Sequence, residues 1–261
     1  MLKIRYGLLQ ISPSGSGSAL RIMSIGWKIK HNSIIDINVK ALQIYTIPGL
    51  GFDSRIFQNI HFENFQITHL EWKEPLSQDE SIEAYAKRYL DEIKGEHIVL
   101  IGHSFGGVLS IELSRLIKID SIFLISSIRH EQEMPVTFNA ISKLKLYKLI
   151  TPGQLAQSVP FWGKFYDYTS AEQMGLAIDM ISNNTKTYLK WAVKTISNWK
   201  FKAQGTETNI TQIHGSKDKT FPISKIKNVD FTVEGGGHFM VYKHGKQIGE
   251  FIQQKINSII I

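Results

Sequence analysis

The chain has 261 residues, 43% of them hydrophobic, which is enough for one substantial core and for one or two domains. It contains no cysteine, so disulfides, a cysteine nucleophile and thiolate metal sites are excluded. The net charge of +7 is concentrated at the start: residues 1–40 carry +5 and the rest only +2. A nearly neutral body argues against a nucleic-acid-binding face, and no apolar run is long enough to predict a membrane span.

Residues 1–40 are predicted to be a poorly defined N-terminal extension. Residues 12–18 alternate serine with glycine and proline, a composition typical of flexible segments. Residues 27–39 fit an edge β-hairpin, but the basic, acid-poor composition also fits a cleaved leader or an organellar targeting segment. A translation start at Met23 is a further alternative. We expect a cytoplasmic protein.

From residue 41 to residue 261, short apolar segments alternate with segments of helical periodicity. This alternation predicts one α/β domain with a mostly parallel, doubly wound sheet. The predicted strands are residues 44–47, 67–72, 97–101, 121–126, 209–214 and 229–233. The predicted helices between and after them are residues 81–93, 108–117 and 245–256.

The pattern changes between about residues 129 and 205, where no strand is predicted. A capping box at Ser170 to Gln173 predicts the start of one helix, and Thr185 predicts the start of another. We therefore expect a helical insertion after the strand at 121–126. It is rich in aromatic residues, namely Phe138, Phe161, Trp162, Phe165, Tyr166, Tyr168, Trp191 and Trp199.

A glycine-flanked serine follows the predicted buried strand at 97–101. Gly102-His103-Ser104-Phe105-Gly106 matches the nucleophile-elbow pattern, in which a sharp strand-to-helix turn lifts a hydroxyl above the sheet. Side chains in place of the two glycines would collide with neighbouring backbone. The helix that follows places free N–H groups near the negative charge that develops during attack on a carbonyl. Ser104 is therefore the predicted nucleophile.

A serine hydroxyl needs a base, and the base needs a group that orients it. Asp218 follows the strand at 209–214, at the sheet edge where parallel-sheet sites gather, and His238 follows three glycines after the last strand. The order Ser104, Asp218, His238 is the one expected after a nucleophile elbow. His103 and His214 are the competing bases.

These motifs resemble those of the α/β-hydrolases over residues 43 to about 257. The matching segments are Pro48-Gly49-Leu50-Gly51, the elbow, His214-Gly215-Ser216-Lys217-Asp218 and Gly236-Gly237-His238. The resemblance implies Ser104 as nucleophile, Asp218 as acid and His238 as base. A carboxylate from the loop after Ser126, such as Glu131 or Glu133, is the fallback acid. It also implies an oxyanion hole made by the backbone N–H groups of Leu50 and Phe105, and a cap formed by the helical insertion. Pro48-Gly49 stands where His-Gly commonly opens that loop.

The expected function is hydrolysis of a carboxylic ester or thioester with an apolar acyl group, through an acyl-enzyme. Acyl transfer, C–C bond hydrolysis and a ligand-binding protein without useful turnover remain open alternatives. Trp162 is predicted to line the substrate site because Pro160-Phe161-Trp162-Gly163 suggests a turn. The aromatic residues of the insertion could equally form its own small core. We expect a small-molecule partner, no nucleic acid, no cofactor and no metal; the sequence leaves the oligomeric state open.

Overall fold

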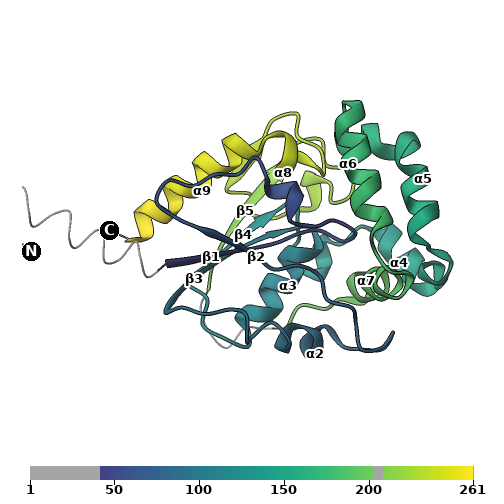
Figure 1. The fold of residues 1–261 in the computed structure, drawn as a ribbon, viewed down its shortest axis with the longest axis horizontal. Helices are drawn as coiled ribbons and strands as arrows, with labels where there is room; N and C mark the ends of the chain where they lie inside the picture. The colour runs from purple at the N-terminus through teal and green to yellow at the C-terminus, as the bar shows by residue number, and fades with distance from the viewer. Residues whose placement is uncertain (1–41, 203–207, 261) are drawn as a thin grey trace, which may run out of the picture.

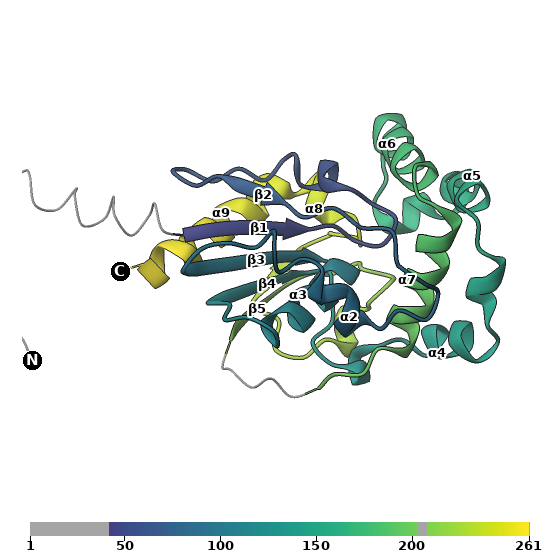
Figure 2. The same ribbon diagram turned by 60° about the horizontal axis from the view of Figure 1, so that its bottom comes forward.

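The computed structural model describes residues 42–202 and 208–260, and these form a six-stranded sheet in which every pairing is parallel (Figures 1 and 2). The strand order is β2-β1-β3-β4-β5-β6. The strands are β1 (Leu42–Ile47), β2 (Ile67–His69), β3 (His97–His103), β4 (Ser121–Ile125), β5 (Asn209–Gly215) and β6 (Phe231–Val233). The predicted α/β class with a parallel sheet is confirmed. The suggested hairpin at 27–39 lies outside the described residues.

The central strands β3 and β4 are buried on both faces of the sheet. Val99 pairs with Ser121 and His103 with Ile125, so the two strands end at the same level. Nearly continuous burial explains their apolar runs, which show no alternation of polar and apolar residues. The carboxyl end of β3, where the elbow begins, therefore lies in the middle of the sheet edge.

Helices cover both faces of the sheet. On one face pack α2 (Ile82–Lys87) and α3 (Phe105–Ser114). On the other face pack the short helix η1 (Ser54–Phe57), α8 (Met240–Lys243) and α9 (Gly245–Ile260) (Figure 1). Successive strand residues alternate between the two cores: Val99 and Ile101 face the second, and Leu100 faces the first.

The insertion between β4 and β5 is helical and lies beyond the carboxyl ends of the strands, at the right of both views (Figures 1 and 2). Its elements are η2 (Glu131–Glu133), α4 (Val136–Lys143), η3 (Leu146–Leu149), α5 (Pro152–Trp162), η4 (Gly163–Tyr166), α6 (Ala171–Ser182) and α7 (Lys186–Asn198). The short helix η5 (Ile223–Lys225) follows β5. The predicted capping box of Ser170 and Gln173 is confirmed, and Thr185 caps α7 through its side-chain oxygen.

Several element boundaries differ from the prediction. The expected helix at 81–93 is regular only as far as Lys87 and continues as turns, and β2 stops at His69. The placement of Trp162 in a turn is wrong, because it is the last residue of α5 and Pro160 lies inside that helix. Within residues 42–202 and 208–260, no helix has the length and apolar character needed to cross a bilayer.

Candidate active site

Ser104 occupies the sharp turn between β3 and α3. Its φ of 52° and ψ of −119° are strained for a residue with a side chain, as the elbow requires. A Cβ at Gly106 would overlap the carbonyl oxygen of Ile47, and one at Gly102 would overlap the backbone of Gly107. The two glycines are therefore needed so that β3 and α3 can meet closely enough to form this turn.

The structure brings Ser104, His238 and Asp218 together at the carboxyl edge of the sheet. His238 Nδ1 lies 2.9 Å from Asp218 Oδ2, and His238 Nε2 lies 3.0 Å from Ser104 Oγ. Because an ionised carboxylate can only accept, the shared proton is on Nδ1 of His238. Nε2 of the neutral ring is then free to accept the hydroxyl proton of Ser104.

Asp218 is buried and held ionised. Burial by itself raises its pKa, but the electrostatic interaction with the His238 imidazole, the hydrogen bond from His238 and smaller contributions from His214 and the Phe221 N–H outweigh burial and lower it. Its Oδ1 accepts from the backbone N–H groups of Thr220, at 2.8 Å, and Phe221, at 3.0 Å. The turn after β5 thus fixes the carboxylate and stabilises its charge.

The two competing histidines make other contacts. His214 Nε2 lies 2.7 Å from the carbonyl oxygen of Phe221, as expected for a residue that bonds backbone, and burial lowers its pKa. His103 Nε2 lies 2.9 Å from the carbonyl oxygen of His238, and burial lowers the pKa of His103 to about 3. Both rings are therefore neutral donors to main-chain oxygens.

The fallback acids Glu131 and Glu133 are engaged elsewhere. Glu133 is buried and accepts from the backbone N–H groups of Arg129, at 2.7 Å, and Lys227, at 2.9 Å. Glu131 accepts from the N–H of Phe201. Their carboxylates tie the start of the insertion to neighbouring loops, whereas Asp218 contacts the imidazole.

The loop at 48–51 lies directly against the elbow. A Cβ added to Gly49 would stand only 2.7 Å from His103 Nδ1 and 3.2 Å from Ser104 Cβ, so a larger residue would force the elbow to move. The Gly49 carbonyl accepts from Trp72 Nε1, at 3.0 Å, and from the Phe52 N–H, at 3.1 Å. These bonds hold the loop that carries Leu50 next to the nucleophile.

Aromatic side chains surround the imidazole of His238. The ring centres of Phe221 and Tyr166 lie 5.6 Å and 5.9 Å from it, both edge-on. The ring centre of Trp162 lies 4.9 Å from that of Tyr166, so the Tyr166 ring stands between Trp162 and His238. Trp162 Nε1 also donates a hydrogen bond to Ser158 Oγ.

Sequence reasoning missed Phe52 and Trp72, which lie against the elbow. It named Tyr166 among the aromatic residues of the insertion but left open whether they line the site or form a core. The ring centre of Phe52 lies 6.4 Å from that of His103, and the Trp72 ring stacks on Phe105 with their centres 5.0 Å apart. Phe52 and Trp72 follow the ends of β1 and β2 closely, which is the signal that could have found them. Tyr166 had no comparable signal, because the fold of the insertion decides where it lies.

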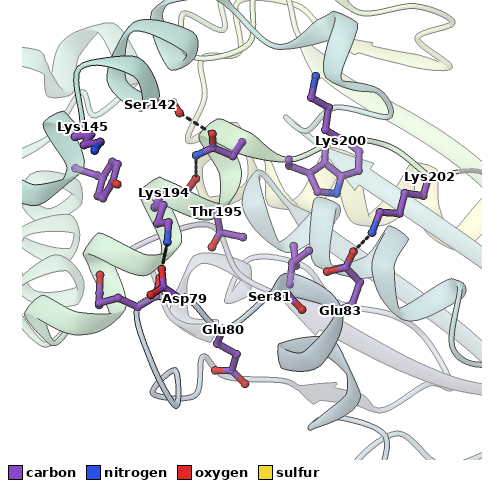
Figure 3. Close-up of a pocket in the computed structure, with 15 residues that line it drawn as sticks. Asp79, Glu80, Ser81, Glu83, Ser142, Lys145, Lys194, Thr195, Lys200 and Lys202 are labelled. Atoms are coloured by element: carbon purple, nitrogen blue, oxygen red, sulfur yellow. Dashed lines mark hydrogen bonds and ion pairs between the residues drawn. The ribbon is translucent and has the colours of Figure 1, made fainter.

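A cavity of about 130 Å³ adjoins this surround, lined by Phe52, Asp53, Glu71, Trp72, Met180, Asn183 and Asn184. A cavity of about 530 Å³ lies instead between the β2–α2 connection, α4, η3 and α7 (Figure 3). Its lining includes none of the three predicted catalytic residues. Ion pairs of Lys194 with Asp79 and of Lys202 with Glu83 cross it (Figure 3).

The comparisons with known proteins found structural but no sequence relatives. No family model matches the chain, and no curated protein matches its sequence significantly. The solved structure of MenH from S. aureus superposes with a TM-score of 0.63 at 16% identity, over 83% of this chain and 94% of that one. A thermophilic esterase from Thermogutta terrifontis gives 0.59 at 15% identity, over 84% and 91%. An epoxide hydrolase from Bacillus megaterium gives 0.63 at 12% identity, over 83% and 93%.

These neighbours include enzymes that differ in their reactions, so the likeness describes the architecture and leaves the chemistry to the site. The likeness covers more than four-fifths of the chain and nearly all of each neighbour. Together with the parallel sheet and the strand–turn–helix around Ser104, it shows that this chain has the α/β-hydrolase fold.

Proposed function

We propose that the protein is a serine hydrolase that cleaves a carboxylic ester or thioester with an apolar acyl group through an acyl-enzyme. The observation that carries this proposal is the 3.0 Å contact between Ser104 Oγ and His238 Nε2, with Asp218 behind the ring. A nucleophile, a base and an orienting carboxylate in this order can perform acyl transfer to the hydroxyl.

In the acylation step, Ser104 Oγ attacks the carbonyl carbon while His238 Nε2 takes the hydroxyl proton. The backbone N–H groups of Leu50 and Phe105 donate to the oxyanion of the tetrahedral intermediate. His238 then gives its proton to the departing alcohol or thiol, and the acyl group stays on Ser104. In the second half of the cycle, water attacks the acyl carbon while His238 Nε2 takes its proton. The bond between that carbon and Ser104 Oγ then breaks, His238 returns the proton to Oγ, and the carboxylic acid leaves.

Asp218 assists both acylation and deacylation. Its charge stabilises the imidazolium that forms when His238 takes the proton, and its hydrogen bond holds Nε2 toward the nucleophile. The three side chains are buried, which strengthens these interactions because little water screens them.

The apolar acyl group is proposed from the aromatic surround. Phe52, Trp72, Tyr166 and Phe221 lie around the elbow and the imidazole, and they offer carbon surface rather than charge. A site of this kind binds ligands mainly by removing apolar surface from water. We expect kcat/KM to rise roughly fourfold for each added methylene until the site is filled.

A fluorophosphonate probe tests the nucleophile directly. We expect stoichiometric labelling of the protein at Ser104, together with turnover of p-nitrophenyl esters. Ser104→Ala should lose both, by many powers of ten in turnover, because the covalent step is removed. Ser258→Ala is the matched control: this exposed serine of α9 donates to the Lys255 carbonyl, and its loss should change neither measurement.

Absence of labelling, with no hydrolysis of any ester or thioester in a panel of acyl lengths, would contradict the proposal and favour a ligand-binding protein. Labelling at Ser104 with transfer of the acyl group to an added alcohol faster than to water would instead identify an acyltransferase. The same panel, run with paired esters and thioesters, separates the two leaving groups.

A further inference from the structure

Residues 143–149, at the end of α4 and in η3, have the sequence Lys-Leu-Lys-Leu-Tyr-Lys-Leu; we call them the Lys/Leu segment. Its leucines are solvent-exposed: Leu144 by 69%, Leu146 by 39% and Leu149 by 73%. Its three lysines are exposed as well. Seven consecutive residues thus combine apolar and cationic side chains on the surface of the insertion.

The exposed apolar side chains are concentrated in this part of the insertion. Of the six large apolar residues exposed in the described chain, five lie between Val136 and Phe161. The five are Val136, Leu144, Leu146, Leu149 and Phe161. If α4 and η3 served only to cover the sheet, we would expect their large apolar side chains to pack against the core, as Phe138 of α4 does. Clustered exposed leucines of this kind mark a surface that contacts another apolar body.

The lysines of the segment have no ion-pair partner in the described part of the chain. Two lysines of the adjoining cavity do have one, since Lys194 pairs with Asp79 and Lys202 with Glu83. Among residues 42–202 and 208–260, no carboxylate lies within ion-pair distance of Lys143, Lys145 or Lys148. Figure 3 shows Lys145 at the rim of the 530 Å³ cavity, without any of the contacts that engage Lys194 and Lys202.

The surrounding sequence adds no compensating charge, since no Asp or Glu occurs between Glu133 and Asp167. A partner must therefore be both negative and apolar. A nucleic-acid duplex offers phosphates, but its stacked bases leave little apolar surface for three leucines, and a second copy would bring the same lysines face to face. An anionic lipid surface offers phosphates to the lysines and acyl chains to the leucines at the same depth.

We propose that the Lys/Leu segment docks the protein peripherally on an anionic lipid surface, with the leucines in the headgroup–acyl boundary and the lysines on lipid phosphates. The inner face of α4 is connected to the site: Phe138 stacks on Phe221 at 5.6 Å, and Phe221 contacts His238. Docking would thus hold the insertion, and the predicted substrate site behind it, beside the lipid surface. The docking itself requires no chemistry at Ser104.

Vesicle co-sedimentation of the full chain tests this proposal. We use vesicles of phosphatidylcholine with about one-third phosphatidylglycerol, and vesicles of phosphatidylcholine alone. Lys143→Gln/Lys145→Gln/Lys148→Gln should weaken binding to the anionic vesicles about a hundredfold, since each lysine near the surface is worth roughly fivefold. The control Lys87→Gln/Lys118→Gln/Lys246→Gln makes the same charge change at exposed lysines of other elements and should weaken binding far less.

The leucines have a matched control in Leu76, which is 79% exposed and lies between β2 and α2. Leu149→Ser should weaken vesicle binding about tenfold, whereas Leu76→Ser should leave it unchanged. Residues 1–40 carry +5, and this charge could also attract the chain to anionic vesicles. The test therefore compares each variant with its matched control and does not depend on the binding of the unaltered chain. Equal losses for the two lysine triples, or equal binding to both kinds of vesicle, would overturn the proposal. Labelling of Ser104 in every variant keeps this result separate from the proposed hydrolysis.

Discussion

His103 donates a hydrogen bond from Nε2 to the main-chain oxygen of His238 across 2.9 Å. The direction is fixed because a carbonyl oxygen can only accept, so the proton of the neutral ring is on Nε2. The residue that precedes the predicted nucleophile thus positions the backbone of the predicted base. Its other nitrogen, Nδ1, is buried without a hydrogen-bond partner in the described chain.

The first prediction concerns this contact. His103→Leu removes the donor and should lower kcat tenfold or more with little change in KM, because a small displacement of His238 weakens proton transfer. His103→Gln offers an amide N–H to the same oxygen and should retain most of the activity. Steady-state kinetics on one ester distinguishes the two variants. Equal kcat for both would show that the bond has no positioning role.

Stability should depend on pH through the same residue. Burial holds the pKa of His103 near 3, whereas an unfolded histidine titrates near 6.5. Below pH 6.5 the unfolded chain takes up the proton first, so the stabilisation is complete above pH 6.5 and is lost progressively toward pH 3. The slope for one such group is about 1.4 kcal/mol per pH unit, or about 2 kcal/mol between pH 6.5 and pH 5.

Urea unfolding at pH 7 and pH 5 measures this dependence. His214, whose pKa is also lowered by burial, adds to the loss in the same direction. Asp218 contributes at lower pH, because its lowered pKa gives stability that disappears only as the pH falls through its folded value. His103→Gln should reduce the slope by about one proton. An unchanged slope would mean that His103 is already protonated in the folded protein.

The predicted acid can be tested against its alternatives. Asp218→Asn removes the acceptor that keeps the proton on His238 Nδ1, and kcat should fall about ten-thousandfold. Glu131→Gln and Glu133→Gln should keep near-normal kcat, although Glu133→Gln should unfold at lower temperature because its buried carboxylate binds two N–H groups. A crippled Glu133→Gln with a stable fold, beside an active Asp218→Asn, would reverse the assignment.

Trp162 supplies the test of substrate lining. Trp162→Ala removes the ring that packs on Tyr166, whose own ring meets His238, so we expect KM to rise more for long acyl esters than for acetyl esters. The melting temperature should drop modestly, since the side chain is only half-buried. Phe161→Ala is the neighbouring control, because Phe161 is 82% exposed and should affect neither substrate. Equal loss for both esters with a large fall in melting temperature would place Trp162 in the core of the insertion.

Local sequence was sufficient to predict the sheet and the three candidate catalytic residues. Ser104, Asp218 and His238 each lie within five residues of the end of a predicted strand, and the ends of parallel strands meet at one edge. The glycines at 102 and 106 indicate that backbone segments lie very close together there, as the sharp turn between β3 and α3 requires. Short-range patterns of this kind depend on residues a few positions apart, so they can be read without knowing the fold.

Tertiary packing alone decided which side chains meet around these residues. Tyr166 reaches His238 only because the helical insertion folds over the strand ends, and no spacing in the sequence encodes that contact. Trp162 ends α5 although Pro160 and Gly163 beside it suggest a turn, since a proline late in a helix can be tolerated where packing compensates. The role of His103 was likewise hidden, because its partner lies 135 residues away along the chain. Long-range contacts of this kind depend on how whole elements pack, which local patterns do not specify.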